Sequence, residues 1–320
     1  MAATMEFADV AVIEVRDLTK RYRGRRQPAV EGLDLDVLEG QLFCLLGPNG
    51  AGKTTTLSIL TTTLVPTGGA ARIAGHDLIK DQSRVRAAIG VVFQGHSLDL
   101  NLTAEENVRL HAVLYGLYPW RPLYRLMSRA YRQQLDGLAT ILGLADVLGK
   151  PARTLSGGMR RKLEIVRALM HRPRVLFLDE PTAGLDPESR RSLWAYLNEV
   201  RDRHGITVFL TTHYLQEAEV ADAVCVLLGG RRIEFGSPDS LKAQLTRREL
   251  VVDAADRASL RSELAAMQLS FGGDGPIRVQ LDHHNAQSVI RAIRSELNVL
   301  RLIEPSLEDA YLMLLEREEP

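Results

Sequence analysis

The chain has 320 residues, and its 40 lysines and arginines are balanced by 40 aspartates and glutamates, so the formal net charge is zero. Binding to nucleic acid through bulk charge needs a surplus of basic residues, and this balance argues against a nucleic-acid partner. Hydrophobic residues make up 45% and charged residues 25%, which is typical of a globular protein rather than a disordered one. At about 150 residues per domain, the length predicts two domains.

The two cysteines, Cys44 and Cys225, each lie within an apolar run, and we expect both to be buried thiols in strands. No apolar stretch approaches the roughly 18 residues that a membrane-spanning helix needs. Any role at a membrane is therefore expected to come through a partner.

Two hydrophobic patterns divide the first 245 residues. Apolar residues alternate with aspartates at 33–37, which predicts half-buried antiparallel strands near the N-terminus. Helical periodicity dominates 104–171, and another helix is expected over 187–204. Strands buried on both faces have continuous apolar runs, and helical patterns between such runs predict a mainly parallel α/β sheet. These runs occupy residues 42–46, 89–93, 175–178, 206–210 and 224–228.

The composition changes after residue 245, and we expect a second domain over 246–320. Its pattern predicts strand, helix, strand, strand, helix, strand and helix, an order that resembles a small ferredoxin-like α+β domain. Ser306 and Asp309 form a short capping box that is expected to open the last helix.

A phosphate-binding loop is predicted between the 42–46 strand and the helix after it, because Gly47 to Thr54 fits G-x-x-x-x-G-K-[ST] at every fixed position. Glycines let the backbone turn tightly and point its N–H groups at a β-phosphate. We expect Lys53 to bridge the β- and γ-phosphates, as a catalytic as well as a binding residue, and the Thr54 hydroxyl to bind Mg²⁺. The predicted nucleotide-binding residues of this loop are Gly47, Asn49, Gly50, Ala51, Gly52, Lys53, Thr54 and Thr55.

Two carboxylates, Asp179 and Glu180, follow the apolar run at 175–178. A buried parallel strand delivers its C-terminal residues to the ligand crevice of the sheet. Asp179 is expected to hold Mg²⁺, and Glu180 to act as a general base toward an attacking water. Taken alone, the pair could equally be capping carboxylates at a strand-to-loop turn.

The segment Leu155-Ser-Gly-Gly-Met159 lies between these two motifs, and with the phosphate loop it makes residues 12 to 245 resemble an ATP-binding cassette (ABC) ATPase. The resemblance implies that Tyr22 stacks on adenine and that residues 183–186 form the D-loop. It implies that Gln94 binds the metal and couples the nucleotide to a helical subdomain over about 97–171. It also implies that His213 contacts the γ-phosphate and, with Glu180, holds the attacking water.

The resemblance further implies a dimer. In a head-to-tail pair, two ATP molecules would lie between the phosphate loop of one chain and the signature segment, with Ser156, Gly157 and Gly158, of the other. A helix N-terminus with glycines and a hydroxyl is an anion site. Simpler roles are alternatives for three of these residues: packing for Tyr22, a solvated amide for Gln94 and a core histidine for His213.

Several segments are similar to ATPase subunits of bacterial exporters of the daunorubicin-resistance and nodulation types: Ser156 to Glu164, Thr211 to Tyr214 and Pro305 to Tyr311. The resemblance implies a motor subunit for a drug or a lipid- or glycolipid-like substrate, on the cytoplasmic face of the membrane. Its partner would be a separate permease with about six spans. The aromatic segment 115–124 either contacts that permease or packs on itself. The alternative function is a soluble, non-transport ABC ATPase that acts as a regulatory switch.

Overall fold

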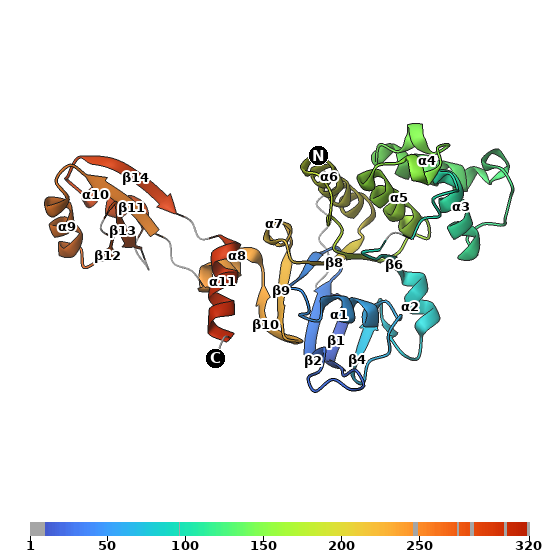
Figure 1. Ribbon diagram of the computed structural model, residues 1–320, viewed down its shortest axis with the longest axis horizontal. Coiled ribbons are helices and arrows are strands. Elements are labelled where there is room, and N and C mark those ends of the chain that lie inside the picture. The colour runs from blue at the N-terminus through green and yellow to red at the C-terminus, as the bar shows by residue number, and fades with distance from the viewer. Residues whose placement is uncertain are drawn as a thin grey trace. The chain divides into compact units, whose positions relative to one another are not determined.

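The computed structural model describes residues 10–95, 97–245, 249–273, 275–281, 285–303 and 306–318. Pro305 of the exporter-like closing segment lies outside this part. The chain separates into two compact units, one ending at Phe235 and the other beginning at Gly236 (Figure 1). None of the helices in the described part is long and apolar enough to cross a membrane.

A six-stranded sheet with the order β10-β9-β3-β8-β7-β6 forms the centre of the first unit. The pairings of β3 with β8 and β9, and of β7 with β6 and β8, are parallel, as predicted. Every residue of β3, β7 and β8 is buried, which explains their continuous apolar runs. Cys44 and Cys225 are buried free thiols within it. The strands span Leu42–Leu46 (β3), Ile89–Val92 (β6), Val175–Asp179 (β7), Thr207–Thr212 (β8), Ala223–Leu228 (β9) and Arg231–Gly236 (β10).

An antiparallel sheet with the order β2-β1-β4-β5 lies beside the central sheet in this unit. The alternation predicted at 33–37 is confirmed, because Leu33, Leu35 and Val37 are buried and the aspartates between them are exposed. These leucines share a core with Phe43 of β3. The strands and adjoining helices span Ala11–Lys20 (β1), Val30–Leu38 (β2), Lys53–Leu60 (α1), Gly68–Ile73 (β4), His76–Asp77 (β5) and Gln82–Ala88 (α2).

Helices α3 (Ala104–Leu114), α4 (Arg129–Ile141) and α5 (Gly157–Leu169) form the helical part of the first unit (Figure 1). A complete capping box of Thr103 and Glu106 starts α3. Beyond β7, α6 (Pro187–His204) is capped by Asp186 and ends at Gly205, whose φ is 63°. The remaining helical segments are α7 (Leu215–Ala218) and three 3₁₀ turns at Tyr124–Leu126, Ala145–Val147 and Ala152–Thr154.

The aromatic segment between α3 and α4 has a packed side and an exposed side. Tyr118 and Tyr124 both present their rings to Tyr131 of α4, with ring centroids 5.3 and 6.2 Å away. Trp120, by contrast, is 60% exposed. Local packing therefore uses only some of these aromatic side chains.

The second unit contains a four-stranded antiparallel sheet with the order β12-β13-β11-β14. The predicted order of elements is confirmed, and this strand order is that of a ferredoxin-like βαββαβ unit. Its core comprises one face of the sheet and the apolar stripes of α9 and α10. The elements span Glu249–Ala254 (β11), Arg257–Ala266 (α9), Ser270–Gly272 (β12), Ile277–Gln280 (β13), Ala286–Ala292 (α10) and Leu297–Ile303 (β14).

Two further helices, α8 (Pro238–Leu245) and α11 (Leu307–Glu318), contact each other in the second unit. The expected hydrogen bonds between Ser306 and Asp309 open α11. Because α8 contacts α11, the compact unit begins ahead of residue 246. The functional division of the chain into 1–245 and 246–320 stays a prediction.

Candidate nucleotide-binding site

The phosphate loop joins the end of β3 to the start of α1 and has no room for side chains at two of its glycines. A Cβ atom on Gly47 would lie 2.3 Å from the carbonyl oxygen of Leu227, and one on Gly52 would lie 2.3 Å from that of Ala29. Gly52 also has a φ of 106°, which L-residues rarely adopt. The sequence pattern therefore reflects a tight backbone turn that is fixed against two neighbouring segments.

The Lys53 ammonium is held inside this turn. Its Nζ donates hydrogen bonds to the carbonyl oxygens of Gly47, at 2.7 Å, and Pro48, at 3.0 Å, and the residue is only 5% exposed. Burial lowers the pKa of Lys53, while the nearby carboxylates of Glu180 and Asp179 oppose that shift. The result is a positioned cation whose Nζ lies 3.9 Å from Glu180 Oε1.

Asp179 ends β7 as a buried carboxylate, with 2% of its surface exposed. The Thr211 hydroxyl donates to its Oδ1 at 2.5 Å, and the Thr54 hydroxyl lies 3.5 Å from the same oxygen. Burial raises the pKa of Asp179, and the hydrogen bond from Thr211 opposes this. A hydroxyl and a carboxylate from two different elements thus meet, and both are oxygen donors of the kind that Mg²⁺ prefers.

Glu180 lies at the convergence of three strand ends. Gln94, which follows β6, donates through Nε2 to Glu180 Oε2 at 3.0 Å. His213, which follows β8, places Nδ1 3.1 Å from Glu180 Oε1. Glu180 has a φ of 45°, and its N–H donates to the carbonyl and hydroxyl oxygens of Thr211. A strained backbone at a carboxylate facing a cleft is common at functional sites.

A single cleft of about 880 Å³ collects most of the predicted residues. Arg23 and Arg25 beside Tyr22, Ala29 and the D-loop Ala183 also line it, and none of these four was predicted as a site residue. In the sequence, the two arginines belong only to a basic run and Ala183 only to the D-loop, and no pattern marks Ala29. The lining comprises Tyr22, Arg23, Arg25, Ala29, Asn49, Gly50, Gly52, Lys53, Thr54, Thr55, Gln94, Glu180, Ala183 and His213.

The predicted signature residues, Ser156, Gly157 and Gly158, do not line this cleft. Ser156 is the N-cap of α5, and its Oγ accepts a hydrogen bond from the Met159 N–H at 3.2 Å. The structure therefore contains a second helix N-terminus of the anion-binding type, separate from the cleft of its own chain.

Comparison with known proteins decides the family. A family model described as ABC transporter matches residues 30–183. The chain is 43% identical over 258 residues to the daunorubicin/doxorubicin resistance ATP-binding protein DrrA of Streptomyces peucetius, covering 79% of this chain and 74% of the relative. It is 35% identical to the Nod factor export ATP-binding protein I of Ralstonia nicotianae, covering 96% and 94%.

The chain belongs to the ATP-binding proteins of ABC transporters. Its fold is also that of the ATP-binding cassette MJ0796, solved as a dimer in a post-hydrolysis state with ADP and phosphate. The TM-score is 0.62 and the identity 25%, covering 70% of this chain and 98% of that one. As an ABC transporter ATPase, the protein binds ATP through its cassette and couples ATP hydrolysis to transport.

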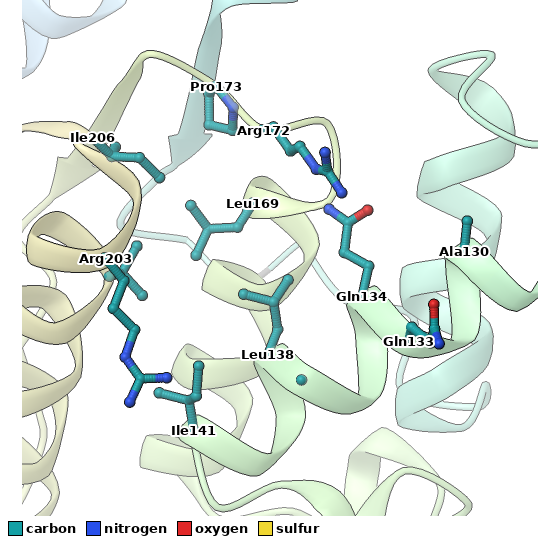
Figure 2. Close-up of a pocket in the computed structure, with 12 residues that line it drawn as sticks. Ala130, Gln133, Gln134, Leu138, Ile141, Leu169, Arg172, Pro173, Arg203 and Ile206 are labelled. Atoms are coloured by element: carbon teal, nitrogen blue, oxygen red, sulfur yellow. The ribbon is translucent and has the colours of Figure 1, made fainter.

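Two features of this ABC ATPase lay outside the predicted site. Arg161, on the helix that the signature segment opens, is 4% exposed and points its guanidinium at the end of β7, where Nη2 donates to the Asp179 carbonyl at 2.7 Å. A second cleft, of about 680 Å³, lies between α4, the end of α5 and the end of α6 (Figure 2). It is lined mainly by apolar residues such as Leu138, Leu169 and Ile206, and contains none of the predicted residues.

Proposed function

We propose that the protein is the ATP-hydrolysing motor subunit of a membrane exporter and that it works as a dimer. The observation that carries this proposal is the arrangement of two half-sites. Lys53, Gln94, Glu180 and His213 line one cleft, whereas Ser156 lies outside it at another helix N-terminus. Each chain carries both halves of a nucleotide site, but the two halves lie apart. A second copy of the chain can therefore bring its Ser156 helix N-terminus to the cleft of the first.

Within one cleft, the loop N–H groups and Lys53 bind the phosphates, and Tyr22 stacks on the adenine ring. Glu180 accepts a proton from the attacking water, while Gln94 and His213 fix the orientation of its carboxylate. Thr54, Asp179 and Gln94 are the residues that would hold Mg²⁺, which neutralises phosphate charge when it is bound. The exposed hydroxyl of Thr54 and the buried carboxylate of Asp179, 3.5 Å apart, fit such an ion.

The dimer predicts a specific effect of Ser156→Ala. Because Ser156 would contact the ATP bound by the other chain, we expect the hydrolysis rate to fall about 10- to 100-fold, the value of a hydrogen bond to a charged group. ATP affinity of the monomer should be unchanged. The measurements are steady-state hydrolysis and ATP titration of the dilute monomer.

Ser128 offers a matched control for this variant, because its hydroxyl caps α4 as Ser156 caps α5, accepting from the Tyr131 N–H at 3.2 Å. Ser128→Ala should lose the same capping energy of about 1 kcal/mol and keep its hydrolysis rate. An equal loss of monomer ATP affinity in Ser156→Ala would refute the placement of Ser156 at the partner's nucleotide.

The exporter part of the proposal draws on the relatives, whose names state drug resistance and Nod factor export. We infer a drug or a lipid- or glycolipid-like substrate and a position on the cytoplasmic face of the membrane, held by a permease with about six spans. The chain and permease, reconstituted in vesicles, should move an amphipathic dye only with ATP. ATP-independent movement would contradict a motor role.

A patch in the helical part is suited to the permease. It consists of exposed apolar side chains within the aromatic segment or next to it: Leu114, Tyr115, Trp120, Leu123 and Leu126. Aromatic residues are over-represented among the side chains that dominate interface energies. The packing of Tyr118 and Tyr124 against Tyr131 would support this patch from beneath.

Trp120→Ser is therefore expected to weaken permease binding by about tenfold, because it removes a large exposed anchor. Basal hydrolysis by the isolated chain should not change. Val65→Ser is the control, since Val65 is also 60% exposed but lies between α1 and β4. Equal permease recovery with both variants would exclude Trp120 from the interface.

A further inference from the structure

Arg161 is a buried guanidinium on α5 that binds three backbone carbonyl oxygens from two separate loops. Nη1 donates to Phe93 at 2.5 Å, Nη2 to Asp179 at 2.7 Å and Nε to Pro181 at 3.2 Å. Phe93 immediately precedes Gln94, and Asp179 and Pro181 flank Glu180 on both sides. One side chain therefore holds the backbone next to Gln94 and on both sides of Glu180. The side chains of Gln94 and Glu180 are hydrogen-bonded to each other.

Glu164, one helical turn further along α5, completes this arrangement. Its Oε2 lies 3.3 Å from Arg161 Nη1, and it is 1% exposed. Its Oε1 accepts a hydrogen bond from the Ser97 N–H at 2.8 Å. The segment that carries Gln94 is thus attached to α5 at both ends, through Phe93 and through Ser97.

The geometry suits an arginine and no smaller donor. A guanidinium is planar and carries five N–H donors in a fixed fork, so it can bind several carbonyls while keeping their relative positions. A lysine has one ammonium at the end of a flexible chain. The three carbonyls, two of which (Asp179 and Pro181) belong to buried residues, would lose this donor if the side chain were apolar.

We propose that Arg161, supported by Glu164, is a positioning residue for ATP hydrolysis: it ties α5 to the loops that carry Gln94 and Glu180. Ser156 starts this helix five residues earlier, so a displacement of α5 at the partner's nucleotide would move both loops of its own site. The inference rests on the roles proposed above for Gln94 and Glu180. Arg161 contacts only protein groups and acts through these two residues.

Arg161→Met should lower the turnover number by about 10- to 100-fold, the scale on which small misplacements slow enzymes. ATP affinity should stay within about twofold, and Arg161→Lys should recover part of the rate. Arg109→Met is the matched control, because Arg109 is 7% exposed, pairs with Glu105 on its own helix and donates to the Arg121 carbonyl, away from both loops. The control should lower thermal stability without lowering the turnover number.

A double-mutant cycle separates positioning from general destabilisation. Gln94→Ala alone is expected to slow turnover, and Arg161→Met should slow it less in that background than in the wild type, since both variants disturb the alignment of Gln94 with Glu180. Full additivity, or equal rate losses in Arg161→Met and Arg109→Met, would overturn the inference. If Gln94→Ala keeps the normal rate, the role proposed for Gln94 is itself wrong. Should Arg161→Met fail to fold, Arg161→Lys with a normal turnover number would refute the proposal.

Discussion

Replacing Glu180 by Gln is expected to lower ATP turnover by about 10²- to 10⁴-fold, the usual contribution of a general base. The amide has the shape of the carboxylate and can still contact Gln94 and His213, but it accepts no proton from water. ATP binding depends on the phosphate loop and should persist. The rate of phosphate release measures turnover, and an equilibrium titration with ATP measures binding.

Glu39→Gln is a suitable control for this variant. Glu39 forms a surface ion pair with Arg174, with Oε1 2.8 Å from Nη2, and does not line the cleft. Its loss should change neither binding nor turnover. A turnover number near that of the wild type in Glu180→Gln would show that another group is the base.

Replacing Lys53 by Met should, unlike Glu180→Gln, weaken the binding of ATP itself. The variant removes the cation that the Gly47 and Pro48 carbonyls position, and it leaves the negative charge of Glu180 facing the bound phosphates. Each hydrogen bond to a charged group contributes about 1.5–3 kcal/mol, so ATP affinity is expected to fall about 10²-fold and hydrolysis at ordinary ATP concentration to become undetectable.

The exposed Lys80 provides the comparison for Lys53, since Lys80→Met removes the same charge outside the cleft. Isothermal titration with ATP distinguishes the variants. Unchanged ATP affinity in Lys53→Met would mean that Lys53 is not a phosphate ligand.

Much of this fold could be predicted because its chemistry is local to short segments. Strands buried on both faces consist mainly of apolar residues, so β3, β7 and β8 were visible as continuous runs. The strand-end rule placed Asp179 and Glu180 at the ligand edge of the sheet, and the resemblance to ABC ATPases implied that Gln94 and His213 lie at the same nucleotide. The contacts of Gln94 and His213 with Glu180 agree with that expectation.

Other features depend on contacts that no local pattern specifies. In the sequence, Arg161 is one of two adjacent arginines on a helix, and only the folded chain brings the carbonyls of Phe93, Asp179 and Pro181 to it. The contact of α8 with α11 joins two segments that lie before and after the ferredoxin-like sheet along the chain. The aromatic segment likewise divides into packed and exposed side chains only when Tyr131 is in place.

The central claim is that this ATPase drives a membrane exporter, and a pull-down from detergent-solubilised native membranes tests it most directly. The tagged full chain should recover, in a fixed ratio, an integral membrane protein with about six apolar segments of helix-spanning length. Recovery of the chain only from the soluble fraction, alone or with a soluble partner, would contradict the exporter and favour a regulatory ATP-dependent switch.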